Sequence, residues 1–199
     1  GGSPDAGGAP IVAPDDTWTW VDFPASKCGN GTPTGIGINP HAGATGTLIY
    51  LQGGGSCTTG ASCWGTPPGA IYMNGFGRDE FESPSTQDKG LQYPILRRDY
   101  PTNPFKDMNL VFIPYCTGDL HSGSGTRNLE LEAETIPTYF WGAKDIEIFL
   151  ERLVPTFPET ERVVIAGVSA GGFGSFLNFD PIARAFGGVR VDVIDDSGP

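Results

Sequence analysis

Short apolar runs bounded by turn-forming residues recur along the chain and predict strands. Residues 17–23 (TWTWVDF) alternate large β-forming side chains with smaller or polar ones, which is typical of a half-buried strand. The runs TLIYLQ and NLVFIPY are apolar almost throughout, as in strands buried on both faces. The predicted strands span 17–23, 36–39, 47–52, 109–115, 163–165 and 189–194.

Apolar side chains at helical spacing lie between the later strands. Residues 138–153 repeat them at i, i+3, i+4 and i+7 (Ile146, Phe149, Leu150, Leu153), which predicts a helix that Pro155 ends. A second helix, over 172–178, is expected to turn its large residues (Phe173, Phe176, Leu177) toward a core. A third helical segment closes at Gly187-Gly188. The alternation predicts an α/β fold with a mostly parallel sheet flanked by helices.

The segment 162–175, RVVIAGVSAGGFGS, carries the strongest chemical signal. An apolar strand runs into Gly-Val-Ser-Ala-Gly, which matches the G-x-S-x-G nucleophile elbow of α/β-hydrolases. The turn from strand to helix is so tight that side chains at Gly167 or Gly171 would clash with neighbouring backbone. We expect Ser169 to be a nucleophile; the alternative is a Gly/Ser-rich turn that merely packs closely.

A second glycine-rich turn, Gly53 to Gly55, follows the predicted strand 47–52. In α/β-hydrolases such a loop supplies backbone N–H groups to the oxyanion hole, and a Cβ there would block their approach to substrate. Three glycines alone are weak evidence, but their position upstream of the elbow is the one that the scheme requires.

Two loops offer further candidates. Residues 56–77 include Trp64 among several aromatic residues, which form either a substrate wall or a small core beneath a long loop. Asp119 and His121 follow the strand 109–115, where loops of a parallel sheet border the ligand crevice. The alternative for Asp119 is that it only bonds turn amides. His121 is expected to line the pocket rather than act as base, since histidine comes last in the α/β-hydrolase order.

The length and composition of the chain indicate how many domains it forms and how much of it is loop. The 199 residues fit one domain, and 30 Gly and 18 Pro predict abundant loops. The opening GGSPDAGGAP lacks apolar periodicity, so residues 1–14 are predicted to be a flexible tether and 15–199 to belong to a single domain. No run is long and apolar enough to predict a transmembrane segment.

The net charge of the chain limits the classes of molecule that it is expected to bind. The net charge is −11, and Arg97-Arg98 is the only adjacent pair of basic residues, so we expect no nucleic-acid partner. An acidic surface also disfavours long polyanionic substrates.

The four cysteines, Cys28, Cys57, Cys63 and Cys116, favour disulfides and an oxidising compartment. A zinc site is the alternative, although no pair shows the short C-x₂₋₄-C spacing of structural zinc.

Five sequence blocks together resemble the pectin acetylesterase/Notum family of α/β-hydrolase serine esterases. The blocks are CGNGTPTGI (28–36), LIYLQGGGSC (48–57), FIPYCTGDLHSG (112–123), AGVSAGG (166–172) and DDSG (195–198). They occur in family order across nearly the whole chain after residue 14, which is far more specific than G-x-S-x-G alone.

The resemblance implies a role for each matching residue. Ser169 is the nucleophile, and the amides of Gly54, Gly55 and Ala170 form the oxyanion hole. Cys57 pairs with Cys63, and Cys28 with Cys116. The family needs no metal or organic cofactor.

The same resemblance leads to a secreted or cell-surface carboxylesterase that removes acetyl groups from a polysaccharide through an acyl-enzyme. An esterase for longer acyl chains and a non-catalytic carbohydrate-binding protein are the alternatives. The family's catalytic Asp and His lie downstream of the DSG block. We therefore expect the later strands and helices, with both residues, to come from a C-terminal fragment of the same protein; Asp196 as the acid is a weaker alternative.

Overall fold

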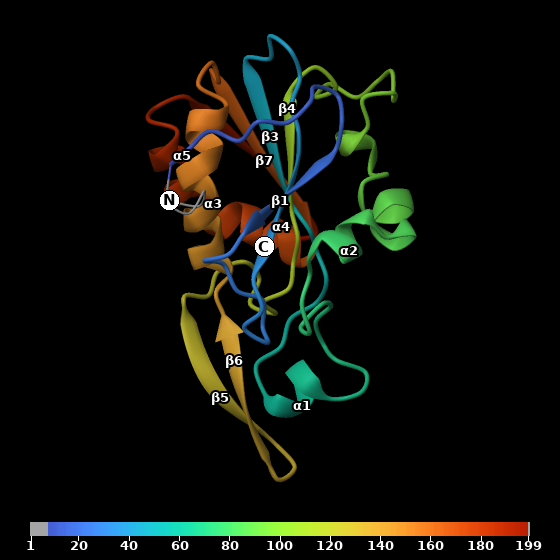
Figure 1. The fold of residues 1–199 in the computed structure, drawn as a ribbon, viewed down its shortest axis with the longest axis vertical. Coiled ribbons are helices and arrows are strands. Elements are labelled where there is room, and N and C mark those ends of the chain that lie inside the picture. Colours follow the sequence, from blue (N-terminus) through green and yellow to red (C-terminus); the bar gives the residue numbers. More distant parts are fainter. Residues whose placement is uncertain (1–7, 199) are drawn as a thin grey trace, which may run out of the picture.

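Six strands form the central sheet of the computed structural model, which describes residues 8–198 (Figure 1). Its order is β1-β2-β4-β3-β7-β8; β3, β4, β7 and β8 pair in parallel, whereas β1 and β2 are antiparallel to their neighbours. The strands are β1 Thr19–Phe23, β2 Thr34–Asn39, β3 Gly46–Leu51, β4 Asn109–Ile113, β7 Arg162–Val168 and β8 Arg190–Asp196. Every predicted strand is present, within a few residues at each end.

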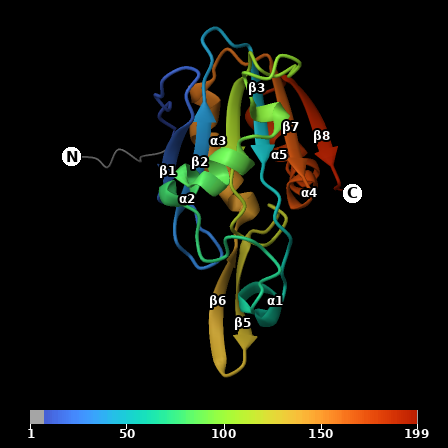
Figure 2. The ribbon, with the colours of Figure 1, turned by 90° about the vertical axis from the view of Figure 1, so that its right-hand side faces the viewer.

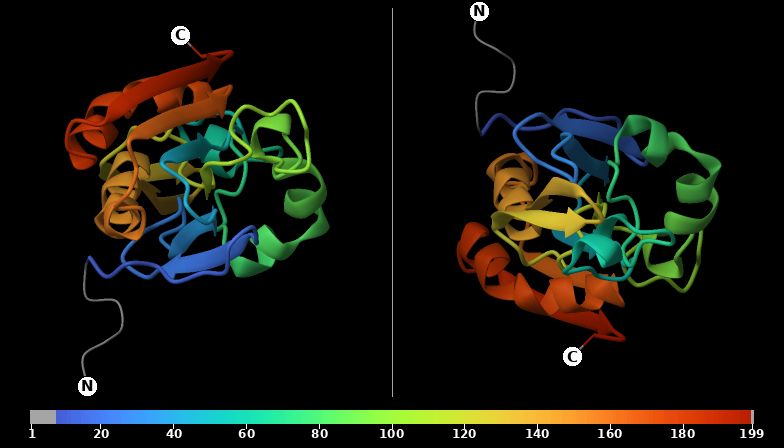
Figure 3. Two further views of the ribbon diagram at one scale, coloured as in Figure 1. Left: turned by 90° about the horizontal axis from the view of Figure 1, so that it is seen from above. Right: turned by 90° about the horizontal axis from the view of Figure 1, so that it is seen from below.

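Helices and long loops cover the two faces of the sheet (Figure 3). Helices α3 (Gly142–Thr156), α4 (Ala170–Leu177) and α5 (Phe179–Ala185) lie on one face. The other face is covered by α2 (Arg78–Glu82), a π-helical turn η1 (Thr86–Gly90), a 3₁₀ turn η2 (Pro94–Leu96) and connecting loops. The α/β architecture with a mostly parallel, helix-flanked sheet is therefore confirmed.

The alternation of side chains along β3 shows how one strand contributes to both layers. Ile49 and Leu51 pack into the core against α3 and α5, whereas Leu48 and Tyr50 pack with the aromatic residues beneath α2. All four are almost fully buried. Two-sided burial explains why this strand is apolar almost throughout.

A β-hairpin that the sequence did not reveal extends beyond the sheet. Within the described part of the chain, strands β5 (Gly125–Leu131) and β6 (Glu134–Phe140) pair only with each other, and α1 (Gly60–Trp64) packs beside β5 (Figures 1 and 2). The hairpin corrects the predicted start of the helix over 138–153, because residues 138–140 belong to β6. The predicted end is also wrong: Pro155 lies inside the last turn of α3, where its missing N–H interrupts little of the helix.

Helix α4 is oriented differently from the prediction. Its buried side consists of small residues, including Gly171 and Gly174, whereas Phe176 and Leu177 are 60% and 47% exposed. A Cβ on Gly171 would meet the carbonyl of Leu51, and one on Gly174 would meet His121. The helix approaches the sheet so closely that only small side chains fit between them, and the large ones point away.

Part of the predicted tether contacts the domain. The N–H of Ile11 donates to Thr156 Oγ1 at 2.7 Å, and its side chain, 9% exposed, joins the core beside α3. Arg152 Nε donates to the carbonyl of Ala9 at 3.1 Å. Residues 1–7 of that tether lie outside the described residues.

Candidate active site

Ser169 occupies the sharp turn between β7 and α4. Its φ of 56° and ψ of −123° place a non-glycine residue in a region that L-residues rarely adopt. Its N–H donates to the carbonyl of Asp196 at 2.8 Å, and its own carbonyl accepts from the N–H of Phe173 at 3.1 Å. The predicted sequence of strand, elbow and helix is thus present, and β8 holds the strained residue in place.

The two motif glycines lie where neighbouring backbone leaves no room for a side chain. A Cβ on Gly167 would collide with the backbone of Gly171, and one on Gly171 would collide with the carbonyl of Leu51. These close approaches are the physical reason for glycine at both positions of G-x-S-x-G.

The loop Gly53 to Gly55 lies beside the elbow. A Cβ on Gly53 would meet the carbonyl of Val168 and lie 3.3 Å from Ser169 Cβ, and Gly55 has a φ of 79°. In the described part of the chain, the N–H groups of Gly54, Gly55 and Ala170 donate no hydrogen bond to another protein group. They remain available for a negatively charged oxygen.

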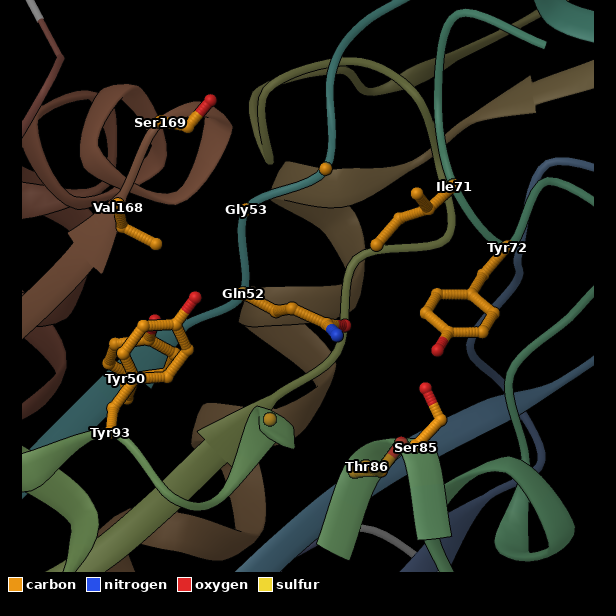
Figure 4. A pocket seen from close by; sticks show the side chains of 12 residues that line it. Tyr50, Gln52, Gly53, Ile71, Tyr72, Ser85, Thr86, Tyr93, Val168 and Ser169 are labelled. Carbon is orange, nitrogen blue, oxygen red and sulfur yellow. The ribbon is translucent and has the colours of Figure 1, made fainter. Parts of the chain in front are cut away.

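A cavity of about 650 Å³ opens at Ser169 (Figure 4). Tyrosine and aliphatic side chains form much of its wall, and no side chain described there carries a charge. Its lining includes Tyr50, Gln52, Gly54, Ile71, Tyr72, Ser85, Thr86, Tyr93 and Val168. Tyr50 is 3% exposed, and its Oη is buried without a hydrogen-bond partner among the described residues.

Several of these residues were missed by sequence reasoning. Ser85, Thr86 and Tyr93 lie in a segment that carries no motif, and no chemistry was expected of it. Tyr50 lies in a strand whose apolar run signalled burial rather than a place in the wall. Of these residues, only Tyr72 had a sequence signal, because it belongs to the aromatic-rich loop 56–77 that was expected to form either a substrate wall or a small core.

His121 does not line this cavity. It is 2% exposed, its ring lies 4.7 Å from that of Tyr115, and its Nε2–H donates to the carbonyl of Gln52 at 2.8 Å. Burial lowers the pKa of His121, although the hydrogen bond to Gln52 opposes this effect. The expected pocket-lining role is therefore wrong. His121 instead holds the backbone just before Gly53 through its hydrogen bond to Gln52.

Asp119 has the structural role that was the alternative. One carboxylate oxygen accepts from the N–H groups of Gly142 at 2.8 Å and Gly123 at 3.1 Å, and the other from Thr117 Oγ1 at 2.6 Å. The residue thereby satisfies the first amide of α3. It does not line the cavity at Ser169.

Trp64 also lies outside the Ser169 cavity. Its indole N–H donates to Thr138 Oγ1 at 2.8 Å, and its side chain lines a second cavity of about 520 Å³. Tyr72 lines both cavities.

His41, the other histidine, lies at the opposite end of the sheet. It follows β2, whose last residue, Asn39, pairs with Leu110 at the start of β4. Its Nδ1 forms a 2.8 Å contact with Asp16 Oδ1. Neither histidine is therefore at Ser169.

The four cysteines form two disulfides. Cys28 is bonded to Cys116 and Cys57 to Cys63, with Cα atoms 4.9 and 5.0 Å apart. The pairing is the one that the resemblance implied, and the alternative of a cysteine zinc site is wrong. Among residues 8–198, no helix has the length and apolarity needed to span a membrane.

Comparison with known proteins identifies the family. The family model described as pectinacetylesterase matches residues 18–199. The chain belongs to the pectinacetylesterase family. Among curated proteins it is similar to three palmitoleoyl-protein carboxylesterases of the Notum type. The protein of Schmidtea mediterranea is 32% identical over 81% of the chain, notum2 of Xenopus laevis 30% over 78%, and the human protein 28% over 86%. The alignments cover 30%, 30% and 34% of those proteins, so the chain spans about a third of their length.

Proposed function

We propose that this protein is a serine carboxylesterase in which Ser169 attacks the ester carbonyl. The observation that supports the proposal is the strained elbow: Ser169 is in the lining of the cavity, next to a glycine loop, and the N–H groups of Gly54, Gly55 and Ala170 donate no hydrogen bond among the described residues. A bond forms between Ser169 Oγ and the carbonyl carbon, and the N–H groups of Gly54, Gly55 and Ala170 stabilise the oxyanion. The ester C–O bond breaks, and the alcohol leaves with the proton that Ser169 Oγ gave up. Water then hydrolyses the acyl-enzyme, which releases the acid and restores the Ser169 hydroxyl.

The substrate that we favour is an acetyl ester carried by a polysaccharide. Membership of the pectinacetylesterase family supports it. A wall without described charged side chains suits an uncharged ester.

A longer acyl chain is the second candidate. The cavity of about 650 Å³ exceeds what an acetyl group needs, and Tyr50, Ile71 and Val168 are in its wall. The similar curated proteins carry the name palmitoleoyl-protein carboxylesterase. Rates for p-nitrophenyl esters from acetate to decanoate separate the two: a maximum at acetate supports the first candidate, and a maximum at eight or more carbons the second.

We further propose that a C-terminal segment of the same protein supplies the acid and the base. Neither histidine reaches Ser169, as described above. Among residues 8–198, β8 is an edge strand, and β8 and the neighbouring helices α4 and α5 carry large exposed apolar residues (Phe176, Leu177, Phe179, Ile194). An open edge beside apolar side chains favours pairing with further polypeptide. The two disulfides favour a secreted or cell-surface location.

The test is covalent labelling of the intact protein by a fluorophosphonate probe. Ser169→Ala is expected to abolish both labelling and hydrolysis of p-nitrophenyl acetate, with little change in melting temperature. Ser197→Ala is the matched control, because Ser197 is exposed and also has a positive φ. Retained turnover by Ser169→Ala, or loss of labelling only in Ser197→Ala, contradicts the proposal.

A further inference from the structure

The second cavity, the one lined by Trp64, adjoins the Ser169 cavity. Residues 70–72 separate the two: Ala70 faces the second cavity, Ile71 faces the first, and Tyr72 lines both. Figure 4 shows Tyr72 and Ile71 across the first cavity from Ser169. The shared side chain of Tyr72 therefore makes the second cavity the neighbour of the one lined by Ser169.

Two aromatic rings in this second cavity are held in fixed positions. Trp64 is fixed by its hydrogen bond to Thr138 on the hairpin. Tyr72 packs edge-on against Phe76, with ring centroids 4.9 Å apart. Rings held before a ligand arrives offer flat apolar area at low entropic cost, which suits the C–H face of a sugar ring.

The polar groups that line the second cavity favour a neutral ligand over a negatively charged one. Glu80 is its only charged side chain among the described lining residues, and its Oε2 already accepts from the N–H of Gly77 at 2.7 Å. Asn74 adds a neutral amide to the lining. A carboxylate and an amide accept hydrogen bonds from sugar hydroxyls, whereas the carboxylate of a uronic acid would be repelled by Glu80.

The wall between the cavities is bonded to the glycine loop. The N–H of Ile71 donates to the carbonyl of Gly54 at 2.9 Å, and that of Ser56 to the carbonyl of Gly69 at 3.0 Å. The disulfide Cys57–Cys63 joins the same loop to a residue that lines the second cavity. A ligand in the second cavity thus packs against backbone that positions Gly54 and Gly55.

We propose that the second cavity is a subsite for a neutral sugar unit of a glycan, next to the unit whose ester is cleaved at Ser169. The inference rests on the proposed esterase function for its place beside the cleaved ester, but not for the binding itself. It assigns the specificity of the enzyme to neutral rather than polyuronate chains.

Calorimetric titration of the intact protein with unesterified oligosaccharides measures the binding without catalysis. Xylohexaose is expected to bind at least tenfold more tightly than hexagalacturonate at 0.1 M salt. Trp64→Ala is expected to weaken xylohexaose binding about tenfold, as loss of a central aromatic contact typically does. Equal binding of the two sugars, or unchanged binding by a folded Trp64→Ala protein, overturns the proposal.

A charge-neutralising variant tests the same subsite through an expected increase in affinity, which a misfolded protein would not show. Glu80→Gln keeps an oxygen for the Gly77 amide and is expected to raise hexagalacturonate affinity about threefold. Glu82→Gln is the matched control: it removes the same charge from α2, but at an exposed position outside the cavity. An equal gain in both variants shows a long-range charge effect and refutes the subsite.

Catalysis supplies an independent comparison. The ratio of kcat/KM for acetylated xylohexaose to that for p-nitrophenyl acetate is expected to fall about tenfold in Trp64→Ala and to stay unchanged in Glu82→Gln. A protein that binds xylohexaose through Trp64 but hydrolyses neither ester refutes the proposed function and leaves the subsite supported. Hydrolysis of both esters with an unchanged ratio in Trp64→Ala refutes the subsite alone.

Discussion

Gly171, two residues after the elbow serine, faces the carbonyl group of Leu51 so closely that a Cβ at position 171 would collide with it. Leu51 is the last residue of β3 and leads into the glycine loop, so this contact joins the two halves of the candidate site. Because glycine has no Cβ, the elbow and the glycine loop can approach each other this closely.

Gly171→Ala is accordingly expected to lower the free energy of unfolding by about 2 to 4 kcal/mol, because backbone rather than a flexible side chain must move. Esterase activity should fall with it. Urea denaturation followed by circular dichroism measures the loss.

The control for this change is Gly125→Ala. A Cβ on Gly125 meets nothing within 4 Å, so the free energy of unfolding should change by no more than about 0.5 kcal/mol. Equal stabilities of the two variants would show that the close approach at Gly171 carries no energetic weight.

The two disulfides should differ in their contribution to stability. Cys57 and Cys63 are 6 residues apart and Cys28 and Cys116 are 88 apart, so the shorter loop restricts the unfolded chain less. Replacement by serine pairs is expected to cost about 2 kcal/mol for the short loop and about twice that for the long one. Thermal unfolding of both double variants gives the order, and a larger loss from the short loop contradicts this account.

Asp145 should make stability depend on pH. It is 4% exposed in the first turn of α3, and burial raises its pKa to about 8, although its hydrogen bond from the N–H of Lys27 acts in the opposite direction. The folded protein thus keeps a proton that the unfolded chain releases near pH 3.8. The contribution is fully present below that pH and is lost as pH rises through about 8, with a limiting slope of about 1.4 kcal/mol per pH unit.

Asp145→Asn is expected to flatten this part of the stability profile, and to leave the variant more stable than the parent above pH 8. Urea midpoints at intervals between pH 4 and 9 measure the slope. Asp180→Asn, at an exposed first-turn position in α5, is the control. An unchanged slope in Asp145→Asn would assign the pH dependence to other groups.

Tyr50 and Tyr115 make a matched pair of buried tyrosines. Burial raises the pKa of both hydroxyls, and the neighbouring Tyr93 hydroxyl raises that of Tyr50 further. Tyr115 Oη accepts from the N–H of Leu120 at 2.9 Å, whereas among the described residues no group lies within hydrogen-bond geometry of Tyr50 Oη. Tyr50→Phe removes an unpaired buried hydroxyl and should stabilise the protein by about 1 kcal/mol; Tyr115→Phe orphans an amide and should destabilise it by about 1 kcal/mol. The same sign for both variants, measured by urea denaturation, would contradict this interpretation.

The sheet was predictable because burial on two faces leaves an unambiguous apolar run in β3, β4 and β7. The hairpin was not, since Leu129, 9% exposed, is the only buried residue of β5, and the turn contains Glu132 at positive φ where glycine or asparagine would signal it.

The candidate site likewise has a part that could be predicted from the sequence and a part that could not. The elbow and the glycine loop were predictable because backbone geometry itself demands glycine there. The wall was not: Tyr93 and Thr86 join the lining of the Ser169 cavity only through the path of the loops between α2 and β4, which no local pattern encodes. His121 was assigned to the cavity from its place after a strand, yet it turns inward because Gln52 offers it a carbonyl.

The hydrogen bond between Trp64 and Thr138 has an evolutionary consequence. The indole that forms part of the second cavity is held by a hairpin whose strands pair only with each other, outside the central sheet. Substitutions in β5 and β6 can therefore reposition Trp64 without touching Ser169, Gly171 or their close contacts with the sheet. Under the proposed glycan subsite, a lineage can in this way change the sugar that is bound through a peripheral hairpin while its least tolerant residues stay constant.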